Sequence, residues 1–130
     1  MATGPQFASV PRVIDRATVS AANTNRDGSG TIVSIASGSA TGLRISSVVC
    51  QPTVTTSAGM IRLFISTDSG TTWNLFDELP VSATTVSASV PGARSERTYT
   101  NLVLSASTVR LGAATHNAES HQVFALGADL

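Results

Sequence analysis

The sequence predicts an all-β protein, a single-domain β-sandwich or jelly roll of about eight strands, on three observations. Short runs of alternating apolar and polar residues recur about every ten residues, bounded by Gly, Asn, Asp and Ser. Val, Ile and Thr together make up 36 of the 130 residues, and β-branched side chains favour a pleated sheet over a helix. No window keeps the period of an amphipathic helix.

The alternating runs supply the candidate strands in order along the chain. Each run has a length suited to one strand, and turn-forming residues separate most of them. The segment 84–90 is the weakest candidate, so eight or nine strands are expected. In order, the candidates are 12–21, 31–37, 43–54, 60–67, 72–81, 84–90, 100–106, 108–114 and 121–128.

Alternation also predicts which side chains share a face of a strand. It places Leu43, Ile45 and Val49 on one face of the run 43–54. The clearest run, 60–67, divides its side chains between two opposite faces. These sets are Ile61, Leu63 and Ile65 on one face, and Met60, Arg62 and Phe64 on the other.

Bulky core residues are few, because the chain has four Phe, one Trp and one Tyr. Two prolines, Pro52 and Pro80, lie within candidate strands. Since proline cannot donate to a strand ladder, both are expected at sheet edges, strand ends or bulges. The bulky side chains expected in the core are Phe64, Phe76, Phe124 and Trp73.

Two regions stand outside the strand pattern. Residues 1–11, with Pro5 and Pro11, predict an extended N-terminal arm, and residues 12–130 form the β domain. Residues 91–99 are expected to form the longest and most charged loop. The chain shows no internal repeat and no second domain.

Low charge and many small hydroxyl groups distinguish the composition. Charged residues make up 12% of the chain, about half the usual ~25%, and the net charge is zero. All eight basic residues are Arg, and there are 18 Ser and 17 Thr. Such a chain is too apolar for disorder, has no basic run for nucleic acid, and has no apolar stretch of ~18 residues for a membrane. Its N-terminus also lacks the features of a secretory signal.

The single cysteine, Cys50, excludes a disulfide within the chain. Its position in the apolar run 43–54 predicts a small buried core residue. A catalytic thiolate would need a partly exposed, electropositive setting, which the neighbouring residues do not supply. We therefore expect no enzymatic role for this thiol.

The loop 23–30 has oxygen-bearing side chains at alternate positions followed by glycine, as in the first half of a calcium loop. The twelfth position of such a loop needs a bidentate Glu, and here that position is Ser34. A tight turn around Asp27 and Gly28 is the favoured interpretation, because Asp-Gly closes such turns. A weak calcium site is the alternative.

The segment 66–73 fits the pattern S-x-D-x-G-x-T-W and resembles the Asp-box of sialidases and other β-propellers. In those proteins the box is structural: its Ser and Asp bind the amides of the turn, and its Trp packs beneath. The resemblance implies that Ser66 and Asp68 cap a turn containing Gly70, and that Trp73 anchors it. The chain holds one box and is too short for a propeller, so no sialidase activity is expected.

The sequence contains no catalytic or metal-binding constellation. His116, Glu119 and His121 lie close together, but a metal site needs several converging ligands, and a polar loop tip is the favoured interpretation. Adjacent Asp77 and Glu78 would point to opposite faces of a strand instead of forming an acid–base pair. The chain has no nucleophile motif, P-loop or dinucleotide fingerprint. We therefore expect no enzyme, no metal and no cofactor.

Other protein is expected to cover part of the surface. Charge depletion, above all the lack of Lys, is typical of interface cores, and symmetric self-association is its commonest form. Arg62 lies in the most apolar strand and needs a partner if it is buried. An ion pair within the fold is one interpretation, and a contact to a neighbouring subunit is the other.

Four sets of segments stand out when taken in order along the chain: NTNRDG (23–28) with GTIV (30–33), GMIRLFI (59–65), ELPV (78–81) and ATHNAE (114–119). Together these segments resemble small β-rich virion structural proteins of tailed bacteriophages. The resemblance spans residues 20–130 and rests on loop and strand patterns. It implies a non-enzymatic role, namely that of a capsid decoration or cement protein that clamps the outer head surface.

The resemblance further implies a homotrimer that is assembled in the host bacterial cytoplasm and becomes part of the virion. Its partners would be the major capsid protein or other virion proteins, with neither nucleic acid nor a membrane. The apolar arm is a candidate tether, and arginines are candidate subunit or capsid contacts. The candidate contact residues are Phe7, Val10, Arg62, Arg94 and Arg97.

Two other classes of protein stay open. The chain could be a tail, neck or baseplate component of the virion, which copy number per particle would separate from a capsid role. It could also be a carbohydrate-binding module, with Trp73 or Tyr99 as an exposed platform for sugar stacking. Burial of Trp73 would count against that second class.

Overall fold

Alternating apolar and polar residues build eight strands within residues 12–130, the part of the chain that this computed structural model describes. This range contains no helix, and neighbouring strands of each sheet are antiparallel, so the all-β prediction with about eight strands is confirmed. The arm expected at 1–11, with Phe7 and Val10, lies outside the described residues. The strands are β1 (Asp15–Val19), β2 (Val33–Ser37), β3 (Leu43–Pro52), β4 (Gly59–Ser66), β5 (Asn74–Val81), β6 (Ser95–Leu104), β7 (Arg110–Thr115) and β8 (His121–Asp129).

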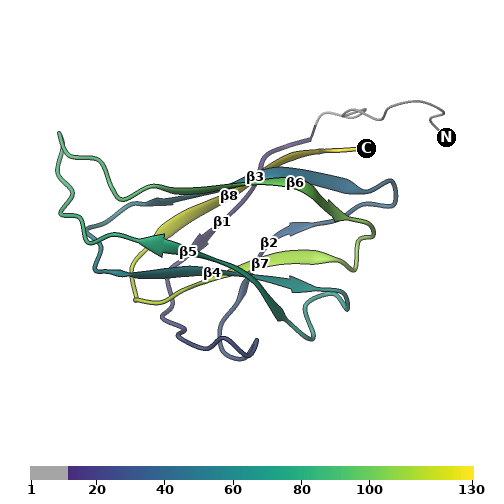
Figure 1. Cartoon of the computed structure of the whole chain (residues 1–130), viewed down its shortest axis with the longest axis horizontal. Coiled ribbons are helices and arrows are strands. Elements are labelled where there is room, and N and C mark those ends of the chain that lie inside the picture. The colour runs from purple at the N-terminus through teal and green to yellow at the C-terminus, as the bar shows by residue number, and fades with distance from the viewer. Residues whose placement is uncertain (1–11) are drawn as a thin grey trace.

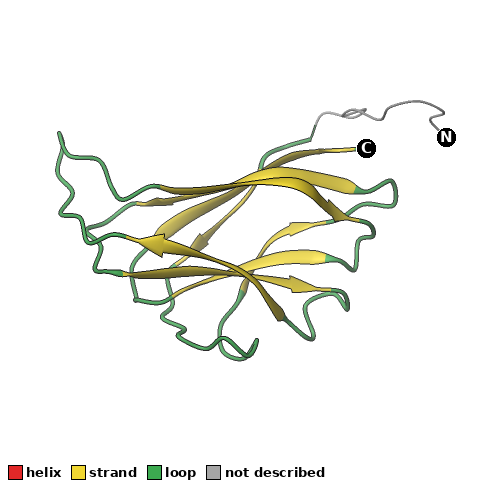
Figure 2. Cartoon of the chain, in the orientation of Figure 1, coloured by secondary structure: helices red, strands yellow, loops and turns green. Residues whose placement is uncertain are grey.

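The strands form two four-stranded sheets. Sheet A has the order β1-β8-β3-β6, and sheet B has the order β2-β7-β4-β5. Figure 1 shows the sheets as two layers, one above the other, and Figure 2 shows loops joining strands at both ends of the layers. The chain passes from one sheet to the other at every connection except the hairpin between β4 and β5.

The core lies between the two sheets and is almost wholly aliphatic. Cys50 is part of this cluster, which confirms its prediction as a buried core residue, and burial raises the pKa of its thiol to about 12. Sheet A contributes Val19, Leu43, Ile45, Val48, Cys50, Leu104, Val123 and Ala125; sheet B contributes Ile35, Ala36, Ile61, Leu63, Leu79, Val81, Leu111 and Ala113.

An irregularity in β3 corrects one predicted face. Between Ile45 and Ser47 the register of β3 shifts against both of its neighbours. As a result Val48, and not Val49, joins Leu43 and Ile45 in the core. The prediction that Val49 shares their face was wrong, because an extra residue reverses the alternation beyond it.

The segment 84–90, predicted as the weakest strand, is a loop. Within the described range its residues make isolated bridges, Thr56 with Thr84 and Ser87 with Val90, but belong to neither sheet. Alternation alone predicted this strand wrongly, because a strand also needs a neighbour with which to exchange hydrogen bonds.

The charged segment 91–99 is a loop only as far as Arg94. β6 begins at Ser95, so Arg97 and Tyr99 lie on an edge strand of sheet A, where the sequence predicted a loop. Charged residues are frequent on edge strands, which explains why this half of the strand lacked an apolar signature.

The aromatic residues are less buried than predicted. Phe64 is fully buried, but Phe76 is 41% exposed, so its prediction as a core residue was wrong. Phe124 and Trp73 are half-buried. The aliphatic residues between the sheets therefore supply most of the core.

The two prolines occupy the positions predicted for them. Pro52 is the last residue of β3, and Pro80 lies in β5, an edge strand of sheet B. Both positions suit a residue that has no backbone N–H to donate.

Sheet B is buried on its outer face as well as on its core face. In β4, Ile61 and Leu63 face the core, while Arg62 and Phe64 on the opposite face are also buried. The connection between β1 and β2, residues 20–32, lies against this outer face, below β4 and β7 in Figure 1. We call it the cover segment.

Close backbone approaches hold the cover segment in place. Ala22 forms a parallel bridge with Thr115 of β7. Gly28 has a φ of +88°, and a Cβ atom there would lie 2.1 Å from the carbonyl oxygen of Trp73. The cover segment therefore packs against the turn that precedes β5.

Candidate functional site

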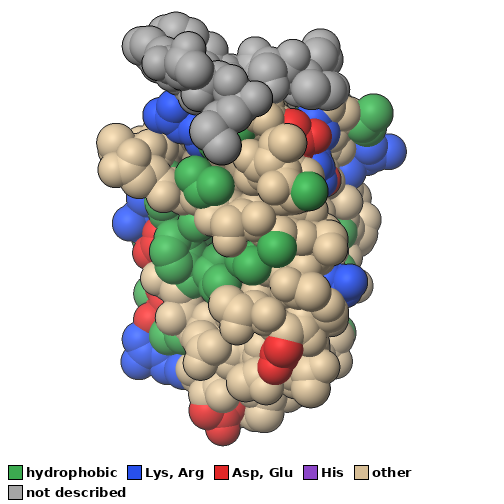
Figure 3. All heavy atoms as spheres, turned by 90° about the vertical axis from the view of Figure 1, so that its right-hand side faces the viewer, with side chains coloured by type: hydrophobic (Ala, Val, Ile, Leu, Met, Phe, Trp, Pro, Cys, Tyr) green, Lys and Arg blue, Asp and Glu red, His purple; other side chains and the backbone are tan. Residues whose placement is uncertain are grey.

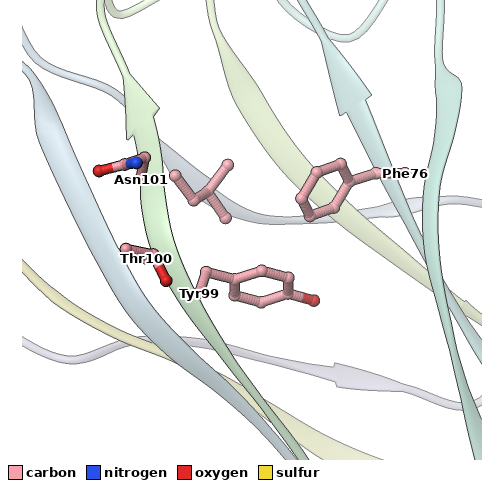
Figure 4. A pocket seen from close by; sticks show the side chains of 5 residues that line it. Phe76, Tyr99, Thr100 and Asn101 are labelled. Carbon is pink, nitrogen blue, oxygen red and sulfur yellow. The ribbon is translucent and has the colours of Figure 1, made fainter.

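A pocket opens between β5 and β6, the edge strands that lie on the same side of the two sheets. Its volume is about 250 Å³. The side chains that line it come from both strands, as Figure 4 shows. They are Phe76, Tyr99, Thr100, Asn101 and Leu102.

Bulges on both edge strands create this pocket. In β5, Asp77 pairs with Leu63 and Leu75 pairs with Phe64, so Phe76 is the extra residue that bulges out. In β6, the register also shifts between Thr98 and Leu102, but here two residues are extra relative to β3. Bulges redirect side chains and increase local twist, and here they turn aromatic residues of both sheets toward each other.

The residues in the β6 bulge are Tyr99, Thr100 and Asn101, which together lie opposite Ser46 of β3. The rings of Phe76 and Tyr99 then meet, with centroids 5.3 Å apart and planes at 40°. This tilted arrangement is a favourable one for two aromatic rings.

Hydrogen bonding fixes the Tyr99 ring in the pocket wall. Its hydroxyl donates to Oδ2 of Asp77 at 2.9 Å, and the same oxygen lies 3.6 Å from Nη1 of Arg97. Burial, followed by the hydrogen bond to Asp77, raises the pKa of Tyr99 well above its usual value. The phenol is therefore neutral at physiological pH, and its donor is already used within the protein.

The pocket suits a single apolar side chain better than a free small molecule. Figure 4 shows the side chains of Thr100 and Asn101 directed away from the space between Tyr99 and Phe76. Small-molecule sites usually enclose roughly 300–1,000 Å³ and offer several placed polar groups. Figure 3 shows apolar side chains gathered at mid-height on one end of the molecule.

The predicted contact residue Arg62 makes an ion pair within the fold. Its Nε lies 3.1 Å from Oε2 of Glu78, and its Nη1 donates to Nδ1 of His116 at 3.2 Å. Arg26 of the cover segment pairs with the same Glu78. The hydrogen bond from Arg26, together with the charges of both arginines, lowers the pKa of Glu78.

This arrangement identifies a partner for Arg62 that the sequence left open. Glu78 and its neighbour Asp77 serve different groups, Arg62 on the outer face of sheet B and Tyr99 at the pocket. A contact of Arg62 with another subunit stays a prediction, and its 7% exposure leaves little of the side chain for such a contact.

The turn 66–73 has the contacts that the Asp-box resemblance implied. Oγ of Ser66 donates to Asp68 and accepts the N–H of Gly70, both at 2.8 Å. Asp68 in turn accepts the N–H of Thr72, which together with the Ser66 hydroxyl lowers the pKa of this carboxylate. Trp73 packs beside Gly70, and a Cβ atom there would lie 3.4 Å from the indole.

The loop 23–30 is held by its own side chains. Asn23 donates to the carbonyl oxygens of Ser29 and Thr31, both at 3.0 Å, and Asp27 accepts the N–H of Ser29. The hydroxyl and the N–H of Ser29 lower the pKa of Asp27. These contacts support the turn interpretation of Asp27 and Gly28.

The histidines do not converge on a common site. His116 contacts Arg62, whereas His121 is buried at the start of β8. Residues 12–130 contain no group of three His, Cys, Asp or Glu side chains placed to hold a metal ion. In this range, no helix is long and apolar enough to cross a lipid bilayer.

The other predicted contact residues lie on or beside β6. Arg94 is 3.4 Å from Glu96, and Arg97 reaches Asp77 and the carbonyl oxygen of Glu78. Both arginines are exposed, so these surface pairs add little stability and leave the guanidinium groups accessible.

The pocket was not predicted from the sequence. The sequence pattern placed Phe76 in the core and offered Tyr99 only as a platform for sugar stacking. One signal was available: Leu75 and Phe76 are adjacent apolar residues in an alternating run, which is what a bulge produces. No family model matches the chain, and comparison with the curated proteins gives no match.

Proposed function

We propose that the protein is a non-enzymatic structural component of a tailed-bacteriophage virion, most specifically a capsid decoration or cement protein. It would fold as a jelly roll and assemble as an oligomer, with a trimer favoured. In this proposal it binds the outer surface of the head, with the major capsid protein as its partner. It would reach the virion from the host bacterial cytoplasm.

The observation that carries the proposal is the strand order. Sheets of order β1-β8-β3-β6 and β2-β7-β4-β5, with most connections crossing between sheets, match the pattern of an eight-stranded jelly roll. Jelly rolls recur in viral capsid proteins and in lectins. This support is an analogy of fold, and the sequence resemblance to virion proteins turns it toward the first of these classes.

The surface independently supports a role as part of an assembly. The 82–92 loop, the long projection at the left of Figure 1, contains no charged residue and exposes Val90. Val13, Ile14 and Val103 are exposed as well. Exposed apolar residues on a charge-poor surface favour contact with other protein.

The proposed mechanism is mechanical. A subunit that bridges neighbouring capsomers adds buried area at each junction, and an interface of about 1,600 Å² is enough for specific binding. Many copies on one lattice reinforce each other through avidity, so each contact needs only modest affinity. The shell would then resist the pressure of packaged DNA better than an undecorated one.

Binding to intact heads tests the proposal. Purified protein should co-sediment with empty heads that lack it, saturate at a fixed number of copies per head, and raise their disruption temperature. Copies in the hundreds support a decoration protein. A dozen or fewer copies confined to one vertex would assign it to the neck, tail or baseplate instead, and no binding to any virion part would contradict the proposal.

A further inference from the structure

We propose that the occupant of the Phe76–Tyr99 pocket is a second copy of this chain. The segment before β1, carrying Val13 and Ile14, would pack into the pocket at the β6 edge of the next copy. Repetition of this head-to-tail contact would close a ring. The inference deepens the proposed function, from which it takes only the expectation of an oligomer.

The first support is a pair of matching features on opposite edges of sheet A. β1 and β6 are its two edge strands. The pocket lies at the β6 edge, and at the β1 edge Val13 and Ile14 are 82% and 54% exposed. One edge of sheet A therefore borders an apolar pocket for one side chain, and the other edge carries exposed apolar side chains.

The second support is that the exposed side chains are held in a fixed position. Arg12 donates to both carboxylate oxygens of Asp15, to Asp129 at 2.9 Å, and to the carbonyl oxygen of Ser37 at 2.8 Å. These bonds tie the segment before β1 to β8 and to β2. Val13 and Ile14 are thus presented in advance, which reduces the entropy lost on binding.

The third support is the height of the two features along the strands. Leu102 of the pocket pairs with Ile45, which pairs with Gly127. The β1–β8 register, continued two residues beyond Asp15, places Val13 opposite the same Gly127. Val13 and Leu102 of the pocket therefore lie at opposite ends of the same row of paired residues across sheet A.

The position of Val13 and the pocket at the same level along the strand direction determines the kind of assembly. One copy meets the next by rotation about an axis along the strands, with little shift along that axis. Head-to-tail contacts close into rings when no shift accumulates, and form open filaments when it does. Rotation also preserves strand direction, so β1 of one copy would run antiparallel to β6 of its neighbour, as adjacent strands do within the sheet.

The fourth support is charge complementarity in the neighbouring rows. Arg16 of β1 shares a row with Phe124, Val49 and, at the far edge, Glu96 of β6. The next row ends in Asp15 at one edge and Arg97 at the other, through Ala125 and Val48. The proposed contact therefore sets opposite charges against each other in both rows.

Solution mass tests the contact directly. Light scattering after size exclusion should give a ring of the intact chain, and Val13→Asp should reduce its mass to one chain, a threefold fall for a trimer. Phe76→Asp at the pocket should do the same, while the exposed loop variant Val54→Asp should leave the ring intact. Mixing the V13D and F76D chains should yield dimers, because that pair retains one intact contact.

Charge exchange makes the test specific to these edges. Arg16→Glu and Glu96→Arg should each raise the dissociation constant of a single contact between copies about fivefold, which corresponds to about 1 kcal/mol. The double variant should restore it, because the two residues meet only across copies. A wild-type monomer at high concentration, a V13D ring, or equal loss in V54D would overturn the proposal. If a monomer binds heads, the proposed contact between copies is wrong but the proposed function is supported. If the protein forms the ring but does not bind heads, the contact is supported and the proposed function is wrong.

Discussion

The outer faces of the two sheets differ in what covers them. On sheet B, the cover segment 20–32 lies over β4, and Arg62 and Phe64 are buried beneath it. On sheet A, Arg44 and Ser46 of β3 are exposed and Phe124 of β8 is half-buried, although Val49 of β3 is only 7% exposed. Within residues 12–130, the protein therefore covers the outer face of sheet B with its own chain, whereas several side chains on the outer face of sheet A are exposed.

The largest expected effect compares a phenylalanine from each face. Phe64→Ala should lower the free energy of unfolding by about 3–5 kcal/mol, because a fully buried ring leaves a cavity. Phe124→Ala should cost about half as much, because this ring is already partly in water. Urea denaturation measures both, and equal costs would contradict the difference between the faces.

A smaller effect is expected where the cover segment meets the turn before β5. Gly28→Ala adds a Cβ atom that would overlap the carbonyl oxygen of Trp73 and strains a φ of +88°, so we expect a loss of about 3 kcal/mol. The single tryptophan should also become more accessible to acrylamide quenching.

Gly42 provides the matched control for this substitution. Its φ of +93° imposes similar strain, but a Cβ atom there meets the ends of Val103 and Leu130 side chains, which can move. Gly42→Ala should therefore cost about 1–2 kcal/mol and leave quenching of Trp73 unchanged. If both variants lost the same stability, the close approach of the cover segment would be unimportant.

Ser66→Ala tests the turn that supports the cover segment, with an expected loss of about 1–2 kcal/mol. The substitution removes the oxygen that accepts the N–H of Gly70 and contacts Asp68. Ser87→Ala, in the exposed 82–92 loop, should be almost neutral. Thermal unfolding of the two variants measures the difference, and similar melting temperatures would show that the turn adds nothing to sheet B.

The smallest expected effect is a pH dependence in sheet A. Burial lowers the pKa of His121, against a weaker opposing effect of Glu119, and Nδ1 of His121 has no hydrogen-bond partner within residues 12–130. The unfolded chain therefore takes up a proton near pH 6.5, before the folded protein does. Stability should be complete above that pH and decline as the pH falls toward 5.

Urea midpoints at pH 7.5 and 5.5 measure this decline in stability. This pH interval lies above the range in which most carboxylates titrate. The variant His121→Leu places an apolar side chain of similar size at this position, and its stability should lose most of this dependence on pH. An unchanged slope would mean that another group causes the dependence.

Local patterns predicted the strands well and the irregularities poorly. Period-two alternation located seven strands and the second half of β6, and proline chemistry placed Pro52 and Pro80, because both depend on nearby residues. The face of Val49 and the position of Phe76 depend on bulges, which only the partner strand defines. The segment 84–90 has a strand's pattern but no place in either sheet.

The candidate site was beyond local patterns for the same reason. The pocket needs Phe76 and Tyr99 to meet across two sheets, and the pairing of Arg62 with Glu78 needs the hairpin register between β4 and β5. The turn contacts of Ser66, Asp68 and Gly70 were accessible from the sequence because they lie within five residues. Contacts between distant segments arise from topology, which composition and spacing do not encode.

The labelling rate of Cys50 can report how often the core between the two sheets opens. The thiol is sealed between the sheets in β3, a central strand of sheet A, and burial keeps it protonated. A maleimide can then react only while the layers are transiently parted, so the labelling rate measures how often they separate. Any partner that restrains this opening, whether a second copy or a capsid, should slow the labelling of Cys50 by the factor by which it lowers the frequency of opening. The natural cysteine is sufficient for this measurement.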